Sequence, residues 1–265
     1  KDLGIVDSAW PLSPRDGEVP PWAERDTAID WPLRMAVYAA MVDRMDQGIG
    51  RIVAALEAKG QLDNTLILFL SDNGGCHEDV EGRNLNTPGS LPGERGSYVA
   101  YRRPWANASN TPFRLFKHWV HEGGCSTPLI AHWPKGMAAR GALTSQVSHI
   151  IDIMPTCVEL ARTSYPESLN GTSILPNEGK SMMSYLQEAP SEPRTLFWEH
   201  MGNTAIRDGD WKLVSRKEEQ PWELYNLVDD RTELDNRIDA EPELAKSIKN
   251  KWDAWAGRVG VHAPR

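Results

Sequence analysis

The segment Ser71-Asp72-Asn73-Gly74-Gly75 places a carboxylate beside a side-chain amide, directly after an apolar run. The side-chain oxygens of Asp72 and Asn73 are the ligand type that a hard divalent cation such as calcium prefers, whereas zinc favours His or Cys. The letters Asp-Asn-Gly also make a good turn. On the dipeptide alone the turn is the simpler interpretation, and a cation site is the chemical alternative.

Lys117 is the second candidate for chemistry. A lysine near a metal offers a point charge to an anionic oxygen, although on spacing alone a solvated surface lysine is the simpler interpretation. The neighbouring His118, His121 and Glu122 suggest zinc at first sight. Their order does not match the His-Glu-X-X-His helix motif, which places its two His four residues apart. The stretch therefore gives no support to a zinc site.

The segments before Asp72 predict a helix and then a buried strand. Apolar residues recur at helical spacing over residues 32–59, and Gly60 follows as a C-cap. Residues 65–70 form a short apolar run, typical of a strand buried on both faces. A helix followed by such a strand predicts an α/β sheet with at least some parallel strands. Ligands of open α/β sheets gather at the carboxyl ends of strands, which is where Asp72 and Asn73 stand.

The remaining chain divides into irregular and regular stretches. Residues 76–111 show no period but carry aromatic and basic side chains, so we expect an ordered pocket wall there. Helical stretches are expected at residues 112–121, from about residue 155, and at 241–255, where Leu244, Ile248, Trp252 and Trp255 share one face. Strands are expected at residues 127–133, 195–200, 203–207, 211–215 and 222–226, with a hairpin signal at Asp208-Gly209. Residues 163–195 are expected to be a linker.

Composition excludes several classes of partner. The 265 residues carry a net charge of -8, which argues against nucleic acid because phosphate binding needs a basic face. No segment reaches the ~18 apolar residues of a membrane helix. The three cysteines are too few for a disulfide framework, and we expect free, mostly buried thiols.

Two motifs together resemble the type I sulfatases of the arylsulfatase group, in the alkaline phosphatase superfamily. One is the segment 71–75; the other is the run Asn-Thr-Pro-Phe-Arg-Leu-Phe-Lys-His-Trp-Val-His-Glu-Gly-Gly from Asn110 to Gly124. The family lysine lies five residues before the Glu of a Glu-Gly-Gly turn, and Lys117 and Glu122 have this spacing. Weaker likeness at residues 126–134, 152–156, 211–213 and 223–227 extends the resemblance over nearly the whole chain.

The resemblance implies a set of roles. Asp72 and Asn73 would be calcium ligands, Lys117 a catalytic residue on the sulfate oxygens, and His118 a substrate-binding neighbour. The implied cofactors are calcium and a formylglycine nucleophile, and the implied partner is a small-molecule sulfate ester. The implied fold is α/β, the C-terminal half of an alkaline-phosphatase-like sandwich of helices around a mixed sheet. Residues 1–175 would form this partial domain, and residues 190–265 a small antiparallel sheet with one covering helix.

The chain also departs from the family pattern. Formylglycine is made from a Cys or Ser followed by X-Pro-X-Arg, and Cys76, Cys125, Cys157 and Ser13 all lack that sequence. We therefore expect the nucleophile, the other calcium ligands and the family's upstream catalytic His on an absent N-terminal portion, and no activity from the fragment alone. A phosphoester or phosphonate hydrolase of the same superfamily and a non-catalytic binding module remain the alternatives. Asn73 speaks against the di-zinc members, which place His there. Family habit implies a periplasmic or secreted location.

Overall fold

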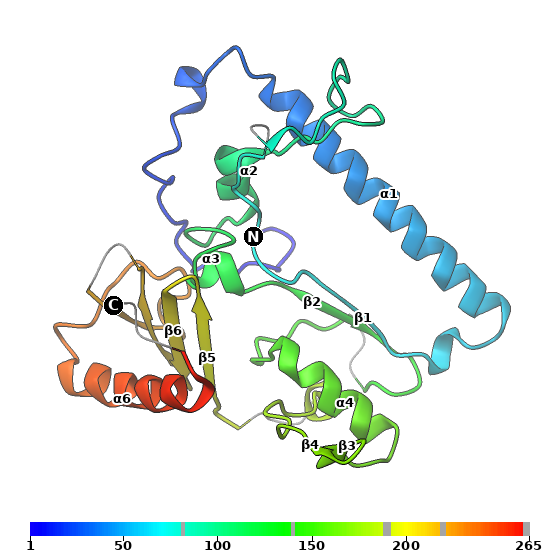
Figure 1. Cartoon of the computed structure of the whole chain (residues 1–265), viewed down its shortest axis with the longest axis vertical. Coiled ribbons are helices and arrows are strands. Elements are labelled where there is room, and N and C mark those ends of the chain that lie inside the picture. The colour runs from blue at the N-terminus through cyan, green and yellow to red at the C-terminus, as the bar shows by residue number, and fades with distance from the viewer. Residues whose placement is uncertain (81–82, 139–140, 188–191, 218–220, 262–265) are drawn as a thin grey trace. The chain divides into compact units, whose positions relative to one another are not determined.

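A computed structural model of the chain describes residues 1–80, 83–138, 141–187, 192–217 and 221–261 (Figure 1). These residues form two compact units. The first contains Lys1–Arg51, Asn73–Pro128 and Pro193–Arg265, and the second contains Ile52–Asp72 and Leu129–Glu192. A unit border after Glu192 falls near the expected start of the small C-terminal part, but this part groups with earlier segments. The division into residues 1–175 and 190–265 stays a prediction.

The first unit contains most of the regular elements. They are the short helix η1 (Trp22–Glu24), helices α2 (Arg102–Ser109), α3 (Glu122–Cys125) and α6 (Pro242–Val259), and strands β5 (Thr195–His200), β6 (Asn203–Asp208), β7 (Trp211–Ser215) and β8 (Glu223–Asn226). The four strands form one antiparallel sheet in the order β5-β6-β7-β8. The predicted strands and the hairpin at Asp208-Gly209 are thereby confirmed.

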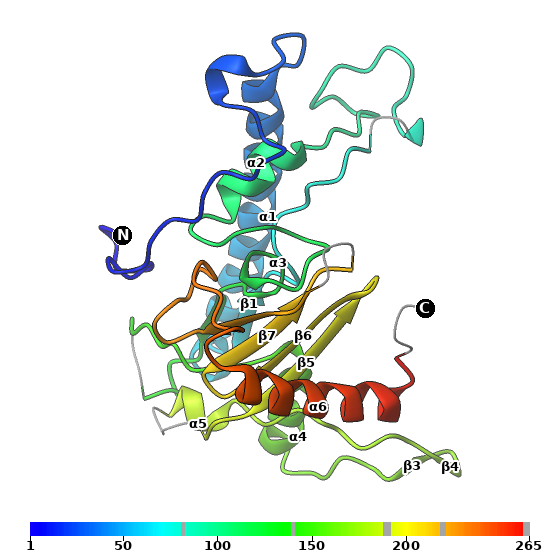
Figure 2. The ribbon, with the colours of Figure 1, turned by 90° about the vertical axis from the view of Figure 1, so that its left-hand side faces the viewer.

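Helix α6 covers one face of this sheet (Figure 2). Alternate strand residues, Ile206, Leu213 and Leu224, pack against Ile248 and Trp252 of the helix. The predicted apolar face of the closing helix is therefore confirmed. Its burial follows from the helical period, which brings residues four apart onto one side.

The opposite face of the same sheet is buried by the segment that contains Lys117. Ala205, Val214 and Tyr225 point to this side and pack with Val120. Because side chains alternate along a strand, Lys212 also lies on this face, and it is fully buried. The sheet thus holds the Lys117 segment on one side and α6 on the other.

The second unit is smaller. Its elements are η2 (Leu62–Asn64), β1 (Ile67–Leu70), β2 (Leu129–His132), η4 (Ile150–Asp152), α4 (Ile153–Leu160), β3 (Ser168–Leu169), β4 (Thr172–Ser173) and α5 (Met183–Leu186). The two apolar strands pair as β1 and β2, but they run antiparallel, so the described residues do not show the expected parallel strands. An apolar run carries no information on strand direction. The expectation that these strands are buried on both faces is also wrong among the described residues, because Phe69 of β1 is 41% exposed and Ile130 of β2 is 61% exposed.

The long helix α1 (Trp31–Ala58) confirms the predicted helix to within one residue at each end. Tyr38 stacks on Tyr101 with ring centroids 4.8 Å apart. Much of the apolar stripe further along is open, with Met41 55% and Met45 48% exposed. The helical period therefore predicted the helix correctly, but much of its apolar stripe is not packed against other described residues.

Two expectations around the site are wrong. Residues 112–121 form turns in place of the predicted helix, because Leu115 and His118 have φ values of 65° and 99°, which no right-handed helix accommodates. Within the loop expected at residues 76–111, Arg102–Ser109 forms helix α2. Pro104 stands in its first turn, where proline is tolerated.

Helices in the described ranges are all too short or too polar to cross a membrane. The three cysteines are free, as expected. Cys157 is exposed, which corrects the expectation of mostly buried thiols.

Candidate functional site

Backbone hydrogen bonds tie the loop that begins at Asn73 to the segment around Lys117. The Gly74 N–H donates to the Gly124 carbonyl at 3.0 Å, and the Lys117 N–H donates to the Gly75 carbonyl at 3.0 Å. These bonds bring the two sequence-predicted motifs together within the first unit.

The Asn110 side chain supplies a second link between the two motifs. Its Oδ1 accepts the Gly75 N–H at 2.9 Å, and its Nδ2 donates to the Leu115 carbonyl at 3.0 Å. A half-buried amide that bonds to both segments holds them at a fixed separation. Asn110 was part of the sequence motif, but its bridging role was not predicted.

Two glycines allow this close approach. A Cβ atom at Gly74 would lie 1.8 Å from the Gly123 carbonyl oxygen, and one at Gly123 would lie 2.2 Å from the Arg114 carbonyl oxygen. Neither space admits a methyl group. Glycine is required here for lack of room, since neither residue has a positive φ.

The Lys117 ammonium lies at the edge of this loop pair. Its Nζ is 3.9 Å from the Glu78 carboxylate and 3.9 Å from the Cys76 sulfur, and the side chain is 38% exposed. Both distances are longer than a tight charge-assisted hydrogen bond, which is about 2.8 Å. Lys117 is therefore anchored through its backbone while its charge can still reach a ligand.

His118 follows Lys117 in a strained backbone conformation, with φ at 99°. Its carbonyl accepts a hydrogen bond from Asn203 Nδ2 at 3.3 Å, and its ring lies 5.0 Å from Trp119 and 5.6 Å from His200. The imidazole is half-buried among these groups. Its role in substrate binding stays a prediction.

The two expected calcium ligands are consecutive residues assigned to different units. Asp72 is exposed and is the last residue of the segment Ile52–Asp72, while Asn73 is half-buried and is the first residue of the segment Asn73–Pro128. Among the described residues, no group of three or more His, Cys, Asp or Glu side chains could hold a metal. The oxygen donors of this pair suit calcium in kind, but two side chains are fewer than the six to eight ligands that calcium takes. The calcium site therefore stays a prediction.

A cavity of about 540 Å³ lies beside Lys117 in the same unit. Its lining consists of Glu18, Pro20, Trp31, His77, Glu78, Asp79, Arg83, Arg102, Arg103 and Pro104. Seven of these ten side chains are ionisable, and two ion pairs, Arg102 with Asp79 and Arg103 with Glu18, lie within the lining. The aromatic and basic wall expected from residues 76–111 is present, but α2 supplies part of it.

His77 connects this cavity to the Lys117 segment. Its ring packs against Phe116 and Trp119, with centroids 4.9 Å away in each case. Burial, together with the positive charge of Arg103, lowers the pKa of His77 below its ordinary value. A neutral imidazole is therefore expected at this wall near neutral pH.

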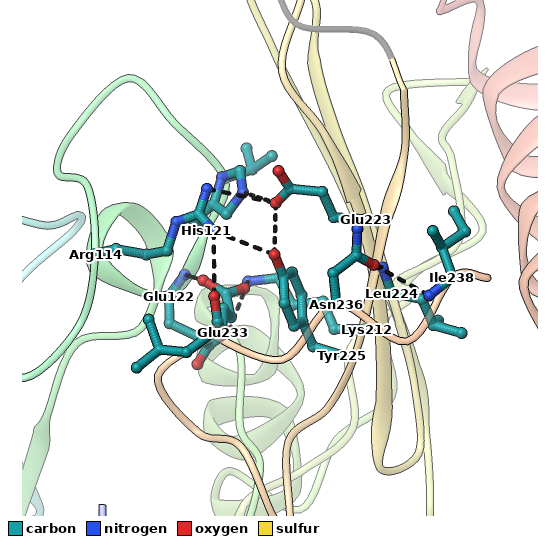
Figure 3. Close-up of polar contacts among 12 residues, drawn as sticks. Arg114, His121, Glu122, Lys212, Glu223, Leu224, Tyr225, Glu233, Asn236 and Ile238 are labelled. Atoms are coloured by element: carbon teal, nitrogen blue, oxygen red, sulfur yellow. Dashed lines mark hydrogen bonds and ion pairs between the residues drawn. The ribbon is translucent and has the colours of Figure 1, made fainter. Parts of the chain in front are cut away.

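A buried network of charged side chains supports the Lys117 segment from the sheet (Figure 3). Lys212 of β7 lies between two carboxylates, 2.7 Å from Glu122 and 3.0 Å from Glu233. The three side chains are 0%, 5% and 0% exposed. Arg231 forms a further ion pair with Glu122 and donates to the Ser126 hydroxyl at 2.8 Å. Buried charges of this kind are tolerated only when paired.

The network continues to β8. The Glu223 carboxylate contacts His121 at 3.1 Å, accepts from the Tyr225 hydroxyl at 2.8 Å and lies 3.4 Å from Arg114. Burial alone would raise the pKa of Glu223, but these partners outweigh it and lower the pKa to about 2. Burial lowers the pKa of His121, which is therefore neutral beside the charged Glu223.

Sequence analysis named Glu122 and His121 and included Arg114 in a motif, but it did not predict that these residues form a buried network. Glu122 belongs to the Glu-Gly-Gly pattern. Lys212 precedes Leu213 in β7, so its side chain points to the other face of the sheet. In an isolated sheet that face would be in contact with water. Only the packing of a distant segment buries it, and no local pattern signals that.

Comparisons with known proteins agree with this arrangement. A model of the sulfatase family matches residues 15–163, and a model described as N-sulphoglucosamine sulphohydrolase, C-terminal, matches residues 113–255. The chain is 31% identical to an uncharacterized sulfatase of Schizosaccharomyces pombe, over 98% of this chain and 50% of the relative. It is 29% identical to an N-acetylglucosamine-6-O-sulfatase of Bacteroides thetaiotaomicron, over 83% of this chain and 35% of the relative.

A solved structure gives the same result. Ps i-CgsB in complex with k-i-k-neocarrahexaose superposes with a TM-score of 0.63 at 25% identity, covering 88% of this chain and 44% of that one. The chain thus spans half or less of the length of these relatives. The expected fold class, an alkaline-phosphatase-like α/β fold with a small C-terminal sheet and helix, is confirmed.

Proposed function

Because this chain belongs to the sulfatase family, we propose that the whole protein hydrolyses sulfate esters and that this chain supplies Lys117, Asp72 and Asn73 to the site. The observation that carries the proposal is the set of backbone hydrogen bonds between the loop that begins at Asn73 and the turn-forming segment around Lys117 (residues 112–121). The Lys117 N–H donates to the Gly75 carbonyl at 3.0 Å, two residues after Asn73. A lysine charge near side-chain oxygens that hold a cation would suit an anionic ester.

The proposed roles follow from charge. Calcium, when bound, supplies positive charge to the sulfate oxygens. Asp72 and Asn73 would hold it with side-chain oxygens, and Lys117 would donate hydrogen bonds to the same sulfate group. His118 would contact the substrate beside it. This chain has no Cys or Ser in the formylglycine pattern, so we propose that the nucleophile comes from outside residues 1–265. A periplasmic or secreted location is proposed from family habit.

We further propose that the alcohol part of the ester is hydrophilic. The cavity beside Lys117 is lined by three arginines, three carboxylates and His77, which can exchange hydrogen bonds with the hydroxyl and amide groups of a substrate. The similarity to an N-acetylglucosamine-6-O-sulfatase and to a protein crystallised with a neocarrahexaose supports the same class. We therefore favour a sulfated carbohydrate.

The test uses the whole protein with Asp72 changed to Ala and to Asn. Asp72→Ala should lose calcium and lower kcat/KM by orders of magnitude, because the metal acts on the transition state. Asp72→Asn keeps an oxygen ligand without its charge and should fall between Ala and wild type. Calcium content, Tm and sulfate release are measured on the same three proteins.

Other outcomes separate the alternatives. If Asp72 is only a turn residue, Asp72→Ala should cost about 1 kcal/mol of stability and leave turnover per folded molecule nearly intact. Preferred turnover of a phosphate or phosphonate monoester would favour a phosphoester hydrolase. A whole protein that binds sulfate esters without turnover would be a binding module.

A further inference from the structure

Glu233, in the loop after β8, is buried and conformationally unusual. Its side chain is fully buried, and its φ of 58° lies in the left-handed region that side-chain-bearing residues rarely adopt. Such a conformation costs on the order of 1–3 kcal/mol and persists only where surrounding contacts impose it. The contacts of Glu233 therefore need an explanation beyond simple packing.

Glu233 bonds to both ends of the segment that contains Lys117 (Figure 3). Its backbone carbonyl accepts from Arg114 Nη1 at 3.1 Å, and its carboxylate accepts the Glu122 N–H at 2.8 Å. Arg114 precedes Lys117 by three residues, and Glu122 follows it by five. One residue thus closes the turn at both ends.

The turn between these two anchors is itself strained. Leu115 and His118, on either side of Lys117, have φ values of 65° and 99°. Without anchors at both ends, a turn containing two such residues would relax toward ordinary backbone conformations. The position of Lys117 against the Gly75 carbonyl depends on that turn.

The anchor is held rigidly by the sheet. Lys212 of β7 lies 3.0 Å from the Glu233 carboxylate, and Arg114 also donates to the Tyr225 hydroxyl of β8 at 3.1 Å. Lys212 and Tyr225 are themselves buried. Because Glu233 and Arg114 both bond to buried side chains of the sheet, the sheet restrains the turn that they hold.

We propose that Glu233 is a positioning residue that sets the Lys117 ammonium against the Asn73 loop, so that the small C-terminal sheet completes the sulfate site. The proposal rests on the function proposed above. The competing explanation is that Glu233 only stabilises the fold.

The test compares variants in the whole protein. Glu233→Gly removes the side-chain contacts while tolerating the positive φ, and Glu233→Gln keeps the shape without the charge. Ile248→Ala, in α6 on the other face of the sheet, is the control for lost stability. For 4-nitrophenyl sulfate well below Tm, kcat/KM should fall at least about tenfold in Glu233→Gly and less in Glu233→Gln, because small misplacements of catalytic groups are costly. The control should change less than about twofold, and an equal loss in it would overturn the proposal.

A double-mutant cycle then asks whether Glu233 acts through Lys117. In a Lys117→Ala background, Glu233→Gly should lower kcat/KM less than about twofold further, because the group it positions is already gone. The same fold-loss in both backgrounds would contradict the proposal while leaving sulfate hydrolysis intact. A wild-type protein that releases sulfate neither from 4-nitrophenyl sulfate nor from a sulfated carbohydrate would contradict the proposed function, and the inference with it.

Discussion

The buried lysine of β7 gives a sharp prediction about stability. Lys212→Met keeps the length of the side chain and removes its charge. It leaves the Glu122 and Glu233 carboxylates, 5% and 0% exposed, without the cation that lies 2.7 and 3.0 Å from them. Glu122 keeps its ion pair with Arg231, whereas Glu233 keeps the hydrogen bond from the Glu122 N–H and the longer-range attraction of Arg114 and Arg231.

The magnitude follows from the distances and the burial. At an effective dielectric constant of about 20, each contact is worth roughly 6 kcal/mol before desolvation is subtracted. Breaking a buried pair on one side costs about 3–5 kcal/mol, because the remaining charge is stranded. Lys249 and Asp253 of α6 offer a matched control, with the same 2.7 Å separation but 41% and 48% exposure. Lys249→Met should cost only about 0.3–0.5 kcal/mol.

Denaturation followed by tryptophan fluorescence measures both variants. The Trp198 ring lies 5.9 Å from the Lys212 ammonium and its carbonyl accepts from Trp252, so emission reports on this sheet. We expect Lys212→Met to lower the free energy of unfolding by several kcal/mol more than Lys249→Met. Equal losses below about 1 kcal/mol would refute the reasoning that the charges in this network depend on one another.

Three further predictions concern the same unit. Because His121 has a pKa below its ordinary 6.5 and Glu223 has a pKa of about 2 against 4.5, the unfolded chain binds protons first on acidification. The contribution of these two groups to the free energy of unfolding should be fully present above about pH 6.5. It should decrease below that pH as His121 is protonated, and decrease again between pH 4.5 and about 2 as Glu223 is protonated. A Tm that rises from pH 7 to 4 would disagree. Asn110→Ala should reduce kcat/KM at least about tenfold in the whole protein by unlinking the two loops, and unchanged kinetics would count against that link. Gly74→Ala should abolish turnover and lower Tm, because its Cβ would lie 1.8 Å from the Gly123 oxygen; a crystal structure of a fully active variant would contradict this.

The local sequence pattern was sufficient to predict those elements whose apolar residues repeat with the period of a helix or a strand. The closing helix and the four short strands of the C-terminal sheet were predicted because apolar residues repeat at 3.6 or 2 residues and turns separate them. The Lys117 turn was mistaken for a helix. The turn has positive φ values at Leu115 and His118, and Arg114 and His118 bond to Glu233 and Asn203, about 100 positions away, which a window of neighbouring residues does not contain.

The candidate site shows the same division. Asp72, Asn73 and Lys117 were found because their order and spacing resemble a family. Glu233 and Lys212 were missed because a charged residue in a loop or on an alternating strand normally faces water. Only the packing of the Lys117 segment onto the sheet makes them buried, and that is a property of the tertiary fold.

Sulfate release by the whole protein and its Lys117→Ala variant tests the central claim most directly. Initial rates on 4-nitrophenyl sulfate and 4-nitrophenyl phosphate are measured for both proteins, with Lys249→Ala as a surface control. We predict faster release from the sulfate ester, a loss of orders of magnitude in kcat/KM in Lys117→Ala, and no change in the control, because Lys117 would meet the charge that develops in the transition state. A Lys117→Ala variant that keeps the wild-type rate, or a wild type that prefers the phosphate ester, would contradict the account.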